Sequence, residues 1–251
     1  MQNRQMGKGA ERKTFCALFL WENEKSGQVF CRKQEISLQD RKSLKEKLRT
    51  GEMELIAIGY PGLQEAARQA AENRDVLRET IPGWMLDEVI RTDERLRATF
   101  AELVGDEISA EKTDVSISDK QDQATVSDGA ANENKALKSS NEKPLGILFP
   151  TSDKGIFAAL WELGEALCCG IDGQLLEIPM KQSVIEICNV ERMNPYEIPS
   201  GGSGLFVTGC GRRMEEFFAK KNLPAAVIGR ITAGADRVLR MEDQVRYLDA
   251  R

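Results

Sequence analysis

Four residues between an apolar strand and an apolar helix have the types needed to bind an anion. The four are Ser152, Asp153, Lys154 and Gly155. Residues 145–149 before them favour a strand, and residues 156–167 after them favour a helix. A strand that enters a helix through a glycine-containing turn directs backbone N–H groups and the positive helix end into one place. The alternative, which we favour because caps are commoner than sites, is that Ser152 or Asp153 only caps the helix.

A glycine loop supplies a second group of candidates. It consists of Ser200, Gly201, Gly202 and Ser203. Successive backbone N–H groups in such a loop can bind a phosphate or a carboxylate. A tight turn before the strand at 205–208 is the simpler interpretation, and we favour it. The two groups together are the ligand-binding candidates, and the ligand they would take is a small anion.

The residue types exclude several classes of chemistry. The sequence has no histidine, so Ser–His and Cys–His nucleophile pairs, imidazole zinc sites and a histidine general base are ruled out. Its six cysteines include no C-x-x-C pair, which argues against zinc ribbons and thioredoxin-type redox sites. Buried free thiols are the expected state of these cysteines. We therefore predict no catalytic residue, no metal and no cofactor.

Charge and hydropathy restrict the partners. The formal net charge of −5 argues against nucleic-acid binding, which requires a concentration of positive charge. No stretch approaches the roughly 18–20 apolar residues of a membrane span. The first residues are polar and basic without an apolar run behind them, which is unlike a secretory signal. We expect a cytoplasmic protein that binds neither nucleic acid nor membrane.

The elements that must position the candidates alternate along the chain. Strands and helices in alternation predict an α/β fold, with a mixed sheet covered by helices. The expected strands are 54–59, 145–149, 174–178, 205–208, 225–231, and 237–241 with a closing strand near Val245. The expected helices are 64–78, 84–104, 156–167, 181–193 and 212–222. On the helix at 181–193, Val184, Ile185, Cys188 and Val190 should face inward.

Composition divides the chain into three parts. Residues 1–51 contain a predicted hairpin at 14–33 and a charged helix capped by Ser37. Residues 106–143 lack aromatic side chains and are rich in charged and small polar residues, so we predict a disordered linker or insertion. Residues 52–105 and 144–251 form the main domain.

Several short stretches match one known superfamily in order and approximate spacing. In the second half they are residues 155–162, 177–182 with 186–188, 194–197, 200–203, and 227–234 with 236–237. In the first half, 59–63 and 81–84 match as well. Together they resemble the C-terminal half of the AIR synthase (aminoimidazole ribonucleotide synthetase) and hydrogenase-maturation superfamily. The closest likeness is to the AIR-synthase-related hydrogenase expression/formation proteins.

The resemblance implies an AIR-synthase C-terminal-domain-like fold and a dimer, and it breaks in two places. The family's N-terminal half, which binds ATP, has no counterpart here. The family's His-Asp-x-Thr-Glu-Gly-Gly motif is also degenerate, because Phe149 and Pro150 replace the histidine and the first acid. Ser152, Asp153 and Lys154 replace the threonine, the glutamate and the first glycine. We therefore do not expect this chain alone to catalyse the family's reactions.

Three hypotheses remain open. The first, which we favour, is a non-catalytic member of the superfamily, or pseudoenzyme, that binds a partner or a small ligand. The second is a subunit of a split ATP-dependent enzyme whose ATP-binding half is another chain. The third is an anion or nucleotide sensor at Lys154, which is weakest because Asp153 would repel the anion. The partner would be a second copy or a chain with the ATP-binding half.

Overall fold

The computed structural model describes residues 16–23, 29–35, 42, 53–105, 142–151 and 153–249. Three predictions therefore fall wholly or largely outside the described residues. These are the role of Ser152, the linker at 106–143 apart from its last two residues, and the charged helix at 37–51. Of that helix only Lys42 is described, in helical conformation.

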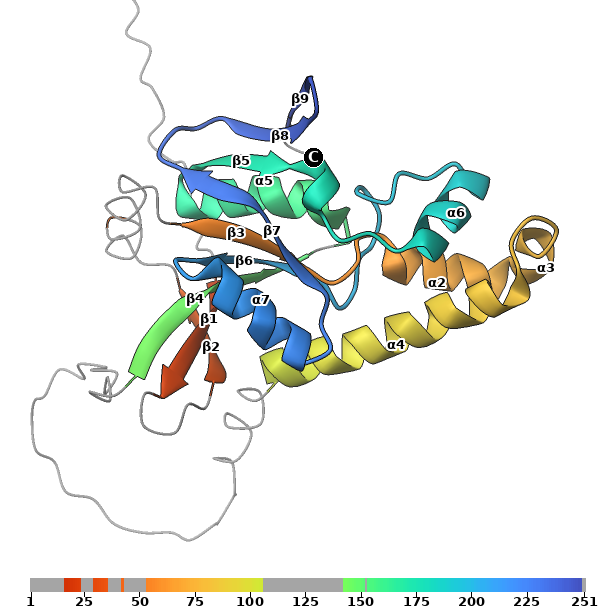
Figure 1. Cartoon of the computed structure of the whole chain (residues 1–251), viewed down its shortest axis with the longest axis horizontal. Coiled ribbons are helices and arrows are strands. Elements are labelled where there is room, and N and C mark those ends of the chain that lie inside the picture. Colours follow the sequence, from red (N-terminus) through yellow and green to blue (C-terminus); the bar gives the residue numbers. More distant parts are fainter. Residues whose placement is uncertain are drawn as a thin grey trace, which may run out of the picture.

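Nine described strands form one sheet in the order β2-β1-β4-β6-β3-β7-β5-β8-β9 (Figure 1). Neighbours are antiparallel except β5 and β8, which run parallel, so the sheet is mixed as predicted. β1 and β2 pair antiparallel where the hairpin was expected, and β1 also pairs with β4, so both belong to this sheet. The strands are β1 (Cys16–Asn23), β2 (Val29–Glu35), β3 (Glu54–Ile58), β4 (Glu142–Pro150), β5 (Gly170–Gln174), β6 (Gly204–Thr208), β7 (Ala225–Thr232), β8 (Arg237–Met241) and β9 (Gln244–Tyr247).

Helices cover both faces of the sheet (Figure 1). They are α2 (Leu63–Glu72), α3 (Arg74–Leu77), α4 (Gly83–Gly105), α5 (Gly155–Leu167), the short 3₁₀ helix η1 (Leu175–Glu177), α6 (Gln182–Val190) and α7 (Gly211–Lys220). Side chains alternate across β3, as the pleat of a strand requires. Leu55 and Ala57 join the core against α5, whereas Ile56 and Ile58 join the core against α2, α4, α6 and α7.

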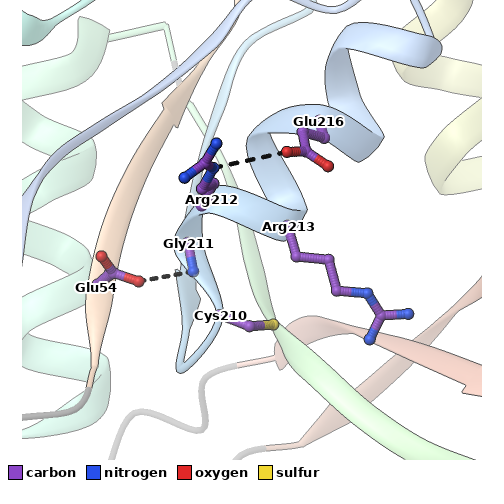
Figure 2. Close-up of a pocket in the computed structure, with 6 residues that line it drawn as sticks. All are labelled: Glu54, Cys210, Gly211, Arg212, Arg213 and Glu216. Atoms are coloured by element: carbon purple, nitrogen blue, oxygen red, sulfur yellow. Dashed lines mark hydrogen bonds and ion pairs between the residues drawn. The ribbon is translucent and has the colours of Figure 1, made fainter.

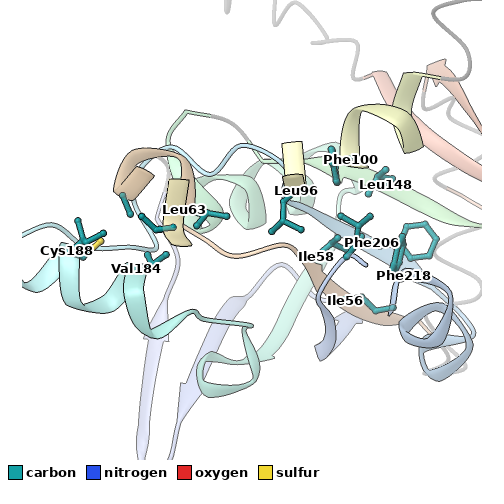
Figure 3. Packing of buried hydrophobic residues seen from close by; sticks show 14 of the residues in the cluster. Ile56, Ile58, Leu63, Leu96, Phe100, Leu148, Val184, Cys188, Phe206 and Phe218 are labelled. Carbon is teal, nitrogen blue, oxygen red and sulfur yellow. The ribbon is translucent and has the colours of Figure 1, made fainter. Parts of the chain in front are cut away.

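The second core is built around the central strands and α7. Phe206 of β6 meets Phe218 of α7 edge to face, with ring centroids 5.5 Å apart. Leu96 and Phe100 of α4 lie in the same cluster (Figure 3). Edge-to-face aromatic pairs contribute roughly 0.5–1.5 kcal/mol beyond the area they bury. This packing fixes α4 and α7 against β3 and β6.

The prediction of a strand at 174–178 is wrong. β5 occupies Gly170–Gln174, and residues 175–177 form the 3₁₀ helix. Cys168 takes a left-handed conformation (φ 52°) and ends α5, so the chain enters the sheet at once. The strand contains Gly170 and Gly173, and its pattern resembles a turn more than a strand. Glycine is favoured most clearly at Gly170, where a Cβ would lie 2.6 Å from the backbone carbonyl oxygen of Asp236.

Two helix predictions also need correction. The helix expected over 64–78 is interrupted at Asn73, whose φ of −108° and ψ of 29° are not helical. Its side-chain amide donates to the side chain of Gln69 (Nδ2 to Oε1, 2.6 Å), and its backbone N–H donates to the Gln69 carbonyl (2.8 Å) at the end of α2. The helix expected over 181–193 ends at Val190, and Val190 is exposed instead of facing inward. Ile187 takes its place in the core.

Candidate functional site

The structure places the glycine loop against Thr151, the residue that precedes the first candidate group. Thr151 begins the turn that carries Asp153 and Lys154. Its hydroxyl oxygen lies 2.6 Å from Ser203 Oγ and 2.8 Å from the carbonyl oxygen of Ser200. Its backbone N–H donates to the Ser203 carbonyl at 3.1 Å. The end of β4 is therefore joined to the glycine loop, although 49 residues separate Thr151 from Ser200.

The polar groups of the glycine loop are largely engaged within the protein. Ser200 Oγ accepts a hydrogen bond from the Gly62 N–H (2.7 Å) and donates to the Ile198 carbonyl (2.9 Å). The Gly201 N–H donates to Gln64 Oε1 at 2.9 Å. Ser203 Oγ donates to the Ser200 carbonyl. Both serines are buried, so the loop joins β4, α2 and β6 through satisfied hydrogen bonds.

Two glycines allow these segments to approach closely. Gly59 has φ +81°, and a Cβ there would lie 2.6 Å from Ser203 Cβ. Gly155 has φ +79°, and a Cβ there would lie 2.5 Å from the carbonyl oxygen of Tyr196. Positive φ is costly for residues with a Cβ, and both positions also lack space for one. Of the predicted candidates, Gly155 is thus required by the backbone itself.

The start of α5 differs from the predicted cap. Its N-cap is Lys154, one residue after Asp153, and the Lys154 side chain makes no capping hydrogen bond. The Phe157 N–H instead donates to the Tyr196 carbonyl at 3.2 Å. Asp153 and Lys154 are both exposed. The side chains of these two candidates therefore face solvent, unlike those of the serines.

An aromatic cluster connects the start of α5 with the last strand. Phe157 and Tyr196 are stacked, with ring centroids 5.0 Å apart. The guanidinium of Arg246 in β9 lies 4.4 Å from the centre of the Phe157 ring, and its Nη2 donates to Glu197 Oε1 at 2.9 Å. Burial raises the pKa of the Tyr196 hydroxyl. These contacts fix the C-terminal strand against the candidate turn, a link that local sequence patterns do not reveal.

A shallow pocket of about 420 Å³ lies at the start of α7, away from the predicted candidates (Figure 2). Its charges already have protein partners. Glu54 Oε2 accepts from the Gly211 N–H (2.7 Å), Arg213 pairs with Glu22, and Arg212 lies 3.7 Å from Glu216. Its lining residues are Glu54, Cys210, Gly211, Arg212, Arg213 and Glu216. No motif in the sequence marks these residues, because their chemistry depends on β3 and α7 meeting.

Within the described ranges, no three His, Cys, Asp or Glu side chains are grouped closely enough to hold a metal ion. The helices that the structure describes include none with the length and apolar character needed to cross a membrane.

Comparison with known proteins gave structural similarities alone. No family model and no curated protein matches the chain. The solved structure of E. coli HypE aligns at 16% identity over 80% of this chain and 50% of that chain, with a TM-score of 0.48. The HypE–HypF complex aligns at 12% identity over 79% and 52%, with a TM-score of 0.47.

The hydrogenase maturation protein HypE in complex with ATP aligns at 18% identity over 41% of this chain and 35% of that chain, with a TM-score of 0.37. The chain thus spans about half or less of the length of the structures it matches.

Proposed function

We propose that this chain is a non-catalytic domain, similar to the C-terminal part of AIR synthases and hydrogenase-maturation proteins, that acts by binding a partner chain. One observation supports this most directly. The hydroxyls of Ser200 and Ser203 and the N–H of Gly201, which a phosphate or carboxylate would need, are hydrogen-bonded inside the protein. A ligand could use them only by breaking those bonds. The loop therefore has a structural role, which is to connect β4, α2 and β6.

The degenerate motif supports the same proposal. Phe149 packs against the core beside α5 and pairs with Leu205 in the sheet. Pro150 lies opposite Gly204 at the end of β4. Neither side chain can donate or accept a hydrogen bond, and proline also lacks an N–H. At the two positions where the family carries a histidine and an acid, this chain thus has residues that contribute to strand pairing and core packing.

The alternative is a split ATP-dependent enzyme whose ATP-binding half is a separate chain. The exposure of Asp153 and Lys154 favours it, because both side chains remain accessible at the start of α5. In a complex they would face a phosphate or carboxylate delivered by the partner. A small anionic ligand bound by the chain alone would be held by Lys154, and the neighbouring Asp153 carboxylate would oppose its binding.

The test is mild affinity purification of the tagged chain from its own cells, followed by native mass spectrometry and an assay of magnesium-dependent ATP hydrolysis. A stoichiometric partner without ATP turnover is the expected result. ATP turnover by the purified chain alone, lost in Asp153→Asn and retained in Asp75→Asn, would overturn the proposal. Turnover only in the complex, with the same dependence on Asp153, would establish the split enzyme. Asp75 is a suitable control because it is exposed on α3, outside the candidate turn.

A further inference from the structure

The glycine loop at 200–203 lies directly on α4. A Cβ on Gly202 would come within 2.8 Å of the Arg97 backbone N and of the Leu96 carbonyl carbon. A Cβ on Gly201 would lie 2.9 Å from Arg97 Cδ. Side chains at these two positions would push the loop away from the helix. The glycines therefore allow the loop to pack against both the backbone and the side chain of Arg97.

The side chain of Arg97 is held in this place by Asp93, one helical turn earlier. Arg97 Nε and Nη2 lie 2.8 and 2.7 Å from the same carboxylate oxygen, Asp93 Oδ2. Half of the Arg97 side chain is exposed, whereas the Asp93 side chain is buried. On the other side of the loop, the Gly201 N–H donates to Gln64 Oε1 of α2 at 2.9 Å. Gly201 thus lies between Gln64 and Arg97, and the position of Arg97 depends on the charge of Asp93.

The surroundings of Asp93 favour its neutral form. Its Oδ1 has no hydrogen-bond partner among the described residues. A buried carboxylate with one unpaired oxygen loses most of its hydration, and a single ion pair offsets only part of that loss. Burial raises the pKa of this carboxyl most strongly, Arg97 lowers it and Glu94 raises it, with a net rise. Asp93 therefore takes up a proton more readily than an exposed aspartate.

The charged groups that act on Asp93 are both on its own helix. They are Arg97 and Glu94. The elements that pack against α4 are α2, α6 and β2, and the glycine loop itself carries no charge. The described charged residues of these elements are Glu65, Arg68 and Glu72 on α2, Lys181 and Glu186 at the start of α6 and within it, and Lys33 on β2. Arg68 pairs with Glu65 and Glu72, and Lys181 pairs with Glu88 of α4.

We propose that Asp93 is a proton-sensitive switch for the glycine loop. In its ionised form it holds Arg97 against Gly201 and fixes the loop on α4. When the carboxylate binds one proton from solvent, the ion pair with Arg97 is lost, and the half-exposed guanidinium turns toward water. Because protonation also removes a buried charge, it loosens the loop without weakening the core.

The change at the loop reaches the end of β4. The Thr151 hydroxyl is hydrogen-bonded to the Ser200 carbonyl and lies 2.6 Å from Ser203 Oγ. A loop that moves away from α4 therefore also alters the contact that positions the turn before α5. The exposed side chains of Asp153 and Lys154 belong to this turn. Acidification would thus alter the order of the candidate turn although Asp93 lies on another element.

Solution NMR of the full chain, from neutral pH down to about pH 4, tests the proposal. The carboxyl carbon of Asp93 reports its protonation, and the amide signals of Gly201 and Gly202 report the position of the loop. We expect these amide signals to shift with the same midpoint as the carboxyl carbon. In Asp93→Asn they should stay near their acid positions at every pH. In Arg97→Gln they should no longer titrate, although Asp93 still does.

Asp87→Asn is the matched control. Asp87 is on the same helix and pairs with Arg74 instead of Arg97, so the Gly201 amide should titrate in this variant as in the wild type. A Gly201 amide that stays fixed while Asp93 titrates would overturn the proposal. A Gly201 titration that survives in Asp93→Asn would do the same, and so would an Asp93 carboxyl that stays ionised across this range. None of these results involves a partner chain, so the proposed function keeps its own test.

Discussion

The hydroxyl oxygens of Thr151 and Ser203 lie 2.6 Å apart and join the end of β4 to the glycine loop. Thr151→Val keeps the shape of the side chain and removes this hydrogen bond. We expect the free energy of unfolding to fall by about 1 kcal/mol, the usual net worth of such a bond. Urea unfolding followed by circular dichroism measures it.

Thr99→Val is the matched control for this variant. The Thr99 hydroxyl donates to the Arg95 carbonyl within the exposed part of α4, at 3.0 Å. The same substitution there should change stability by no more than about 0.5 kcal/mol. Equal losses at both positions would show that the Thr151 contact does not connect the two segments in solution.

Gly155→Ala should lower the free energy of unfolding more than Thr151→Val does. Gly155 has φ +79°, and the new Cβ would meet the Tyr196 carbonyl. The left-handed conformation alone costs a residue with a Cβ about 1–3 kcal/mol, and the close approach adds to that cost. Gly105→Ala provides the comparison, because no other described residue lies within 4 Å of a Cβ at that position and its φ is not positive. It should be neutral or stabilise α4 by up to about 1 kcal/mol. The thermal midpoints of the two variants separate these expectations.

Most of the fold could be predicted because its signals are local. β3 and β6 are short apolar runs, and α5 is apolar over nearly its whole length. The strand prediction at 174–178 failed because tertiary contacts outweighed the local pattern at β5. β5 carries two glycines that read as a turn, and they are tolerated because neighbouring strands approach closely there.

The candidate site was predicted in part. The residue types and positions of the turn and of the glycine loop could be recognised in the sequence. The hydrogen bonds that connect the glycine loop to other segments could not. Gly62 binds Ser200 across 138 residues and Gln64 binds Gly201 across 137, and no local pattern encodes such contacts. The sequence also could not distinguish the buried serines from the exposed Asp153 and Lys154, because their exposure depends on how α2 packs against the loop.

Asp93 should make stability depend on pH. It is 3% exposed on α4, Arg97 Nη2 lies 2.7 Å from its Oδ2, and its Oδ1 has no hydrogen-bond partner among the described residues. Burial raises the pKa of its carboxyl above the ordinary 3.8. The folded protein therefore holds this proton more tightly than the unfolded chain. The associated stability is fully present below the ordinary pKa and is lost as pH rises through the raised one.

Asp93→Asn, which resembles the protonated carboxyl, should therefore be more stable than the wild type at pH 7, and the difference should shrink on acidification. Asp87→Asn on the same helix is the control with the opposite sign. A hydrogen bond from Arg74 lowers the pKa of Asp87, so this variant should lose stability at neutral pH and converge with the wild type in acid. Chemical unfolding at several pH values measures both trends. A constant difference for Asp93→Asn across that range would mean that the carboxyl does not titrate differently on folding.

The cysteines should differ sharply in reactivity. Burial raises the pKa of the Cys188 thiol to about 11, and its side chain is 1% exposed in the core between α6 and α2. The thiolate is the reactive form, so iodoacetamide at pH 8 should leave Cys188 unmodified in the folded chain. Cys168 is exposed at the end of α5 and should be alkylated much faster than Cys188. Peptide mass spectrometry after timed labelling distinguishes the two sites, and labelling in urea should make their rates similar. Rapid modification of Cys188 without denaturant would mean that α6 separates from α2 on the timescale of the reaction.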